Sequence, residues 1–133
     1  MLINFTWEEF DKSIYEIFEH SRNWNLSGIY GIPRGGLCLA VAISHSLRIP
    51  LLNKPEPNSL VVDDVYETGQ TLSRLPMFVK MTTYVWFSKV EPEGWNAVEV
   101  CNSNEWLIFP WENPQQARLD KLAYRLSRGL SND

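Results

Sequence analysis

The chain has 133 residues, of which 44% are hydrophobic, and a formal net charge of −4. This length fits one hydrophobic core, so we predict a single domain over residues 1–133. Acidic and basic residues are scattered without a basic stripe, which argues against a nucleic-acid coat protein. No apolar run approaches the roughly 20 residues of a membrane span, and we recognise no signal peptide, so neither nucleic acid nor membrane is predicted as a partner.

The predicted elements alternate between helices and strands. A capping box, Thr6-Trp7-Glu8-Glu9, opens an amphipathic helix that runs to about Ser21. The other expected helices are a buried apolar one, a short one and an amphipathic one after the Asn113-Pro114 cap, over 37–47, 70–75 and 114–130. The expected strands cover 27–32, 50–52 at a sheet edge, 60–62, 82–87, 97–101 and 105–109. This order predicts an α/β fold with a mostly parallel central sheet flanked by helices.

Two cysteines and two histidines bear on redox and metal chemistry. Cys38 and Cys101 lie far apart in apolar surroundings, which favours two buried, reduced thiols over a disulfide. Reduced thiols fit a cytoplasmic protein. His20 and His45 are isolated and lack the spacing of zinc ligands, so no zinc site is predicted.

The segment Leu60–Leu72 reads LVVDDVYETGQTL and joins two acids at a strand end to a glycine-containing turn. Adjacent carboxylates such as Asp63 and Asp64 repel each other unless cations or hydroxyl groups meet them. The turn Thr68-Gly69-Gln70-Thr71 can direct backbone amides and two hydroxyls at one anion. Carboxylates for sugar hydroxyls beside amides for a phosphate predict a ribose 5-phosphate site. For a bare Asp-Asp pair the alternative is a helix cap followed by an ordinary turn.

A second turn, Pro33-Arg34-Gly35-Gly36, follows the first central strand. Its glycines let the backbone approach a ligand closely, and Arg34 can form paired charged hydrogen bonds to a phosphate. Ligands of parallel α/β sheets bind beyond the carboxyl ends of the strands, so we expect both turns at that edge. The alternative is a generic glycine-rich turn with an exposed arginine.

Together the two turns resemble the signatures of the type I phosphoribosyltransferases. The resemblance implies that Asp63 and Asp64 contact the ribose hydroxyls and hold Mg²⁺, directly or through water or ribose. It gives Glu67 a catalytic role beside the reacting base, and assigns the 5′-phosphate to Tyr66, Glu67, Thr68, Gly69, Gln70 and Thr71. Pyrophosphate binding goes to Arg34, Gly35 and Gly36, with Arg34 stabilising the leaving group. The resemblance also implies a cis peptide bond between Pro33 and Arg34.

The segment Trp106–Glu112 resembles the Trp-x-x-x-Pro-Trp-acid segment of xanthine-guanine phosphoribosyltransferases. This implies that Trp106 stacks on a purine, with backbone groups nearby at Leu107 and Ile108 reading its edge. The same subfamily places a lysine against the purine 6-oxo group, a role that falls to Lys89. A cationic donor there favours guanine, xanthine or hypoxanthine over adenine. Core packing is the alternative for Trp106, because the chain has six tryptophans.

The resemblance covers about residues 28–112 and implies transfer of the 5-phosphoribosyl group from phosphoribosyl pyrophosphate (PRPP) to a 6-oxopurine, with release of pyrophosphate. Purine salvage, a Mg²⁺ cofactor and a homodimer follow from the same resemblance. The sequence departs from the family in two places: only Asn53–Ser59 is available for the mobile hood loop, and Glu67 replaces an aspartate. Two alternatives therefore stay open, namely a non-catalytic PRPP- or nucleotide-binding regulatory module and a phosphoribosyltransferase for another base.

Overall fold

The computed structural model describes residues 2–75, 81–101, 105–127 and 129. The chain divides into two compact units, Met1–Asp11 with Asn104–Asp133 and Lys12–Ser103. The expectation of one domain over 1–133 stays a prediction. Among the helices that the structure describes, none combines the length and apolar character needed to cross a membrane.

The larger unit is built on a five-stranded sheet in which every pairing is parallel. The strand order is β3-β2-β4-β5-β6, so β3 lies at an edge, as predicted, and β4 lies at the centre. The strands are β2 (Ile29–Gly31), β3 (Leu51–Leu52), β4 (Leu60–Tyr66), β5 (Thr82–Ser88) and β6 (Asn96–Val100). The predicted α/β fold with a parallel central sheet is confirmed.

Strands β4 and β5 form the core of this unit. Leu60, Val61 and Val62 are fully buried, as expected of a strand that is covered on both faces. The prediction that this strand stops at the acids is wrong, because β4 continues through Asp63 and Asp64 to Tyr66. Its ladder with β5 continues to the pair Tyr66 and Ser88, and these pairings outweigh the low strand propensity of aspartate.

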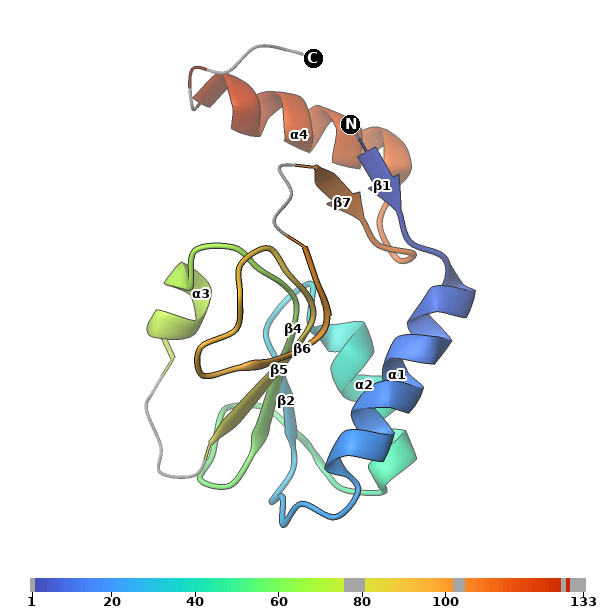
Figure 1. Ribbon diagram of the computed structural model, residues 1–133, viewed down its shortest axis with the longest axis vertical. Helices are drawn as coiled ribbons and strands as arrows, with labels where there is room; N and C mark the ends of the chain where they lie inside the picture. Colours follow the sequence, from blue (N-terminus) through green and yellow to red (C-terminus); the bar gives the residue numbers. More distant parts are fainter. Residues whose placement is uncertain (1, 76–80, 102–104, 128, 130–133) are drawn as a thin grey trace. The chain divides into compact units, whose positions relative to one another are not determined.

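Two helices of the larger unit lie on opposite sides of the strands, as Figure 1 shows: α2 (Leu37–Leu47) and α3 (Gln70–Ser73). Right-handed crossovers require this, because α2 connects β2 to β3 in one direction and α3 connects β4 to β5 in the other. The bounds of α2 agree with the prediction, but the expectation that the helix is buried on all sides is wrong. Leu37 and Val41 are 43% and 44% exposed, because a helix on a sheet covers only one of its own faces.

The smaller unit holds a parallel pair of short strands, β1 (Leu2–Asn4) and β7 (Trp106–Ile108), and the helix α4 (Pro114–Ser127). The sequence did not indicate β1. Asn113 caps α4 as predicted, since its Oδ1 accepts hydrogen bonds from the amides of Gln115 and Gln116. The predicted last turn of this helix, up to Leu130, extends beyond the described residues.

Helix α1 (Trp7–Ser21) begins in the smaller unit and ends in the larger one. The predicted capping box is confirmed: Glu9 N donates to Thr6 Oγ1 and Thr6 N donates to Glu9 Oε1, both at 3.1 Å.

Both cysteines are free, as predicted. The expectation that both are buried is wrong, because Cys101 is exposed and Cys38 is only partly buried, which raises the pKa of its thiol.

Candidate functional site

The strand order reverses at β2, and both predicted turns lie at this reversal. The chain passes from β2 through α2 to β3 on one side, and β4 then pairs on the other side of β2. Such a switch point opens a crevice at the carboxyl ends of the strands. The Arg34 turn follows β2, the two acids lie near the end of β4, and Ile32 N donates to the Val62 carbonyl at 2.9 Å. The structure therefore brings the two motifs to one edge, as predicted.

Direct contact between Gly35 and Asp64 joins the two turns. A Cβ atom on Gly35 would collide with the Asp64 carboxylate, so glycine is the residue that leaves this carboxylate in place. The peptide bond between Pro33 and Arg34 is cis, as the resemblance implied. The Arg34 side chain is exposed, and within the described residues it has no ion-pair partner.

Asp63 is buried and Asp64 is partly buried, and among the described residues neither has a compensating cation. Asp63 Oδ1 accepts a hydrogen bond from Asp64 N, and Asp64 Oδ1 accepts one from Val65 N, both at 2.8 Å. Burial, and secondarily the neighbouring Asp64 carboxylate, raise the pKa of Asp63 to about 8. Burial also raises the pKa of Asp64. Neither carboxylate pairs with a lysine or arginine in the part of the chain that the structure describes. The pair is therefore suited to receive a cation or hydroxyl donors from a ligand.

The turn after β4 presents polar groups outward. Gly69 has a φ of 79°, in the left-handed region that favours glycine. Thr68 and Thr71 are exposed. The amides of Thr68 and Gly69 have no hydrogen-bond partner among residues 2–75, 81–101, 105–127 and 129. Two amides and two hydroxyls are thus available to an anion.

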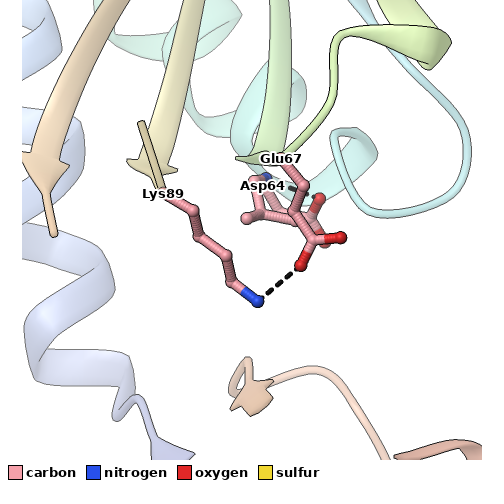
Figure 2. Close-up of polar contacts among 4 residues, drawn as sticks. Asp64, Glu67 and Lys89 are labelled. Atoms are coloured by element: carbon pink, nitrogen blue, oxygen red, sulfur yellow. Dashed lines mark hydrogen bonds and ion pairs between the residues drawn. The ribbon is translucent and has the colours of Figure 1, made fainter. Parts of the chain in front are cut away.

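Lys89 lies beside the acidic turn and forms an ion pair with Glu67. The distance from Lys89 Nζ to Glu67 Oε1 is 2.5 Å, and the side chains are 15% and 38% exposed. Figure 2 shows the ammonium group of Lys89 directed at Glu67, with Asp64 close by. The Lys89 amide also donates to the Tyr66 carbonyl at 2.9 Å. The two residues to which the sequence gave separate roles are therefore direct partners.

An aromatic pair that the sequence analysis missed lies next to this turn. The rings of Tyr66 and Trp95 stack with centroids 3.6 Å apart and an interplanar angle of 17°. Trp95 Nε1 donates to Ser88 Oγ at 3.1 Å. No local pattern could have revealed the pair, because Trp95 belongs to the connection between β5 and β6 and meets Tyr66 only through the sheet register.

No protein-family model matches the sequence, and a comparison with curated proteins gives no match either. Solved structures do match. A purine phosphoribosyltransferase from Pyrococcus horikoshii Ot3 is 25% identical, with a TM-score of 0.69 over 84% of this chain and 95% of that one. A xanthine-guanine-hypoxanthine phosphoribosyltransferase from Helicobacter pylori is 18% identical, with a TM-score of 0.69 over 91% and 99%. A Neisseria gonorrhoeae protein with bound ppGpp is 18% identical, with a TM-score of 0.63 over 93% and 96%.

The chain has the type I phosphoribosyltransferase fold. The predicted resemblance is confirmed at this level, because the matched structures cover most of both chains and share the parallel α/β architecture. In this fold the site described above lies at the carboxyl edge of the central sheet.

The segment available for a hood loop, Asn53–Ser59, runs from the carboxyl end of β3 to the amino end of β4. Ser27 N donates to the Asn58 carbonyl and Ser27 Oγ donates to the Pro57 carbonyl, both at 2.9 Å. Ser27 precedes β2, so these bonds fix Pro57 and Asn58 near the amino ends of the strands.

The residues predicted to contact the base from the phosphoribosyltransferase resemblance lie in the smaller unit. Trp106 packs against Tyr124 with ring centroids 5.4 Å apart. Leu107 and Ile108 are buried, and the Ile108 carbonyl accepts a hydrogen bond from Phe5 N at 2.8 Å. This packing agrees with the alternative interpretation, in which Trp106 is a core residue and not a stacking partner of the base. The role of all three residues toward a base stays a prediction.

Proposed function

We propose that this protein transfers the 5-phosphoribosyl group of PRPP to a 6-oxopurine (guanine, xanthine or hypoxanthine) and releases pyrophosphate. The observation that carries the proposal is the contact of Gly35 with Asp64 at the switch point, which joins a phosphate-binding turn to a pair of buried acids. The similarity to a purine phosphoribosyltransferase over most of both chains supports the same reaction class.

Each part of PRPP has a counterpart at this edge. Asp63 and Asp64 accept hydrogen bonds from the ribose hydroxyls, and the turn Tyr66–Thr71 binds the 5′-phosphate through its amides and hydroxyls. Arg34 and the amides after it bind the pyrophosphate. In the reaction the bond from the anomeric carbon to pyrophosphate breaks and a bond to a purine nitrogen forms. Arg34 stabilises the negative charge that develops on the leaving group.

Mg²⁺ fits the acid pair, because hard cations prefer carboxylate oxygens and neither carboxylate is paired with a lysine or arginine among the described residues. Asp63 and Asp64 would hold the ion directly or through water or ribose. The described residues gather no group of three or more His, Cys, Asp or Glu side chains. Water and oxygens of PRPP would complete the coordination. When bound, Mg²⁺ supplies positive charge that offsets the charge on the leaving pyrophosphate.

The ion pair of Glu67 and Lys89 defines the side on which the base enters. Lys89 donates to the 6-oxo group, and Glu67 accepts the proton that the attacking purine nitrogen loses or holds the base in place. Lys89 Nζ and Glu67 Oε1 are 2.5 Å apart, so a base that binds here has to take over part of the Lys89 hydrogen bonding. Trp106 is proposed as the stacking residue from the family resemblance.

A non-catalytic module that binds PRPP or a nucleotide is the second candidate. Two observations favour it: the segment available for a hood loop is short and its end, Pro57 and Asn58, is tied to Ser27, and one structural neighbour has bound ppGpp. Water exclusion by a closing loop contributes to catalysis, whereas binding alone does not need it. A phosphoribosyltransferase for another base is a third candidate, which keeps the PRPP site and removes Trp106 from it.

The deciding experiment measures pyrophosphate release with Mg²⁺ and PRPP, separately with guanine, xanthine, hypoxanthine and adenine. Release with a 6-oxopurine and not with adenine is the expected result. Release with adenine alone would support the third candidate, and PRPP binding without release would support the regulatory module. If the protein binds neither PRPP nor a nucleotide, all three are wrong. Arg34→Ala serves as the control that should lose any release observed.

A further inference from the structure

We propose that Trp95 is a positioning residue for the 5′-phosphate loop, defined as Tyr66–Thr71. Its indole holds the ring of Tyr66 against Gly69 and so fixes the conformation in which the loop meets a phosphate. The inference rests on the proposed function, because it assigns a role at the same site to a residue that the sequence motifs do not include.

The stack is tight and lies at the functional edge of the sheet. With centroids 3.6 Å apart and planes 17° from parallel, the two rings overlap over most of their faces. Tyr66 is both the last residue of β4 and the first residue of the loop. Both rings are half-buried, unlike the core tryptophan Trp86, which is 1% exposed. The pair is therefore not part of the central core.

Trp95 is itself held by the neighbouring strand. Its Nε1 donates to Ser88 Oγ at 3.1 Å, and Ser88 Oγ donates to the Val90 carbonyl at 2.6 Å. Ser88 is fully buried and pairs with Tyr66 across the sheet. Paired residues on adjacent strands point to the same face, so Ser88 presents the indole on the face where the Tyr66 ring lies. The position of the indole is thus set by β5 and not by the loop.

Gly69 connects the stacked rings to the amides that we propose bind the phosphate. A Cβ atom on Gly69 would collide with the Tyr66 hydroxyl, which shows that the ring lies directly on this glycine. Gly69 carries one of the two amides available to an anion, and its left-handed φ is readily lost by a flexible glycine. A ring that is held in place limits that freedom, so the loop does not have to be ordered when the ligand binds.

The test compares two ligands that use different turns. The dissociation constants of ribose 5-phosphate and of Mg²⁺-pyrophosphate are measured by calorimetry on the full chain, for wild type, Trp95→Ala and Trp95→Phe. We expect Trp95→Ala to bind ribose 5-phosphate about tenfold more weakly and pyrophosphate within about twofold of wild type. Trp95→Phe keeps a ring for stacking and should recover most of the loss. Glu91→Ala, an exposed change in the same connection, is the matched control and should alter neither constant.

A purely structural role would weaken both ligands equally, and that outcome would overturn the inference. Unchanged ribose 5-phosphate binding by Trp95→Ala would overturn it as well, while leaving the proposed function intact. If the wild type itself fails to bind ribose 5-phosphate, the proposed function is wrong and the inference falls with it. Should Trp95→Ala not fold, Trp95→Leu, which keeps apolar volume without a ring, decides by the same two constants.

Hydrogen exchange gives a second readout that needs no ligand. The amides of residues 67–71 should exchange about tenfold faster in Trp95→Ala than in wild type, because the loop loses its support. Exchange in Glu91→Ala should match wild type. Equal exchange in Trp95→Ala and wild type would show that the stack does not order the loop.

Discussion

The two halves of β4 share neighbours but differ in chemistry. Leu60, Val61 and Val62 are apolar and fully buried between β2 and β5. The second half begins with Asp63 and Asp64, whose pKa values are both raised by burial. The first half contributes the apolar burial that stabilises the sheet, whereas the second half places ionisable groups where ionisation is unfavourable. A single strand thus combines a stabilising segment with a destabilising one, which is the arrangement expected where activity conflicts with stability.

The largest effect is expected from a substitution in the first half of β4. Leu60→Ala should lower the free energy of unfolding by about 2–5 kcal/mol, because it removes a fully buried side chain and leaves a cavity. Urea unfolding measures this loss. PRPP affinity at temperatures where the variant is folded should match wild type. A large loss of affinity in the folded variant would show that the two halves are not separable.

Asp64→Asn tests the second half. We expect PRPP binding in Mg²⁺ to weaken about a hundredfold, or about 2.7 kcal/mol, because the variant loses a charged ligand for the metal and ribose. Stability at pH 8 should stay level or rise, since a buried charge is removed. Calorimetry and thermal unfolding measure the two quantities. A loss of stability comparable with that of Leu60→Ala would contradict the contrast drawn between the halves.

Glu67→Gln separates chemistry from binding within the second half. Turnover should fall by about tenfold or more with little change in PRPP affinity, because the amide cannot accept a proton from the purine. Steady-state rates and PRPP titrations supply both values, and the exposed Glu93→Gln is a matched control. Turnover equal to wild type would remove Glu67 from the catalytic group.

The buried acid Asp63 also predicts a dependence of stability on pH. The pKa of Asp63 is about 8 in the folded chain, against about 3.9 in an unfolded one, so the folded state retains a proton that the unfolded state releases. Stability should therefore fall as pH rises from about 4 to about 8, by at most about 1.4 kcal/mol per pH unit for one proton. Thermal unfolding across this range checks the slope, and Asp63→Asn should flatten it. A slope that is the same in both proteins would contradict the assignment to Asp63.

Local chemistry explains what the sequence could predict. The bounds of α2 follow from its apolar run, and the start of α1 follows from the capping box of Thr6 and Glu9. The two turns were recognisable because their glycines and charges stand together in the chain. That the two turns lie close together could be predicted because the carboxyl ends of parallel strands lie at the same side of a sheet.

The features that escaped prediction depend on distant partners. Strand β1 has only three residues and exists through its pairing with β7 near the other end of the chain. The continuation of β4 through Asp63 depends on the ladder with β5, which strand propensity does not describe. Glu67 and Lys89 were each singled out, but their ion pair required the register of β4 and β5, as did the stack of Tyr66 and Trp95.

The contact between Gly35 and Asp64 also constrains how such sequences can diverge. A methyl group at position 35 would occupy the space of the carboxylate, so Gly35→Ala is tolerated only if the acid at 64 shortens or moves. The same holds in reverse, because the carboxylate of Asp64 can keep its place only opposite a residue without a side chain. Homologues should therefore lose the two residues together, and the pair should covary as one unit although separate segments of the chain supply its members.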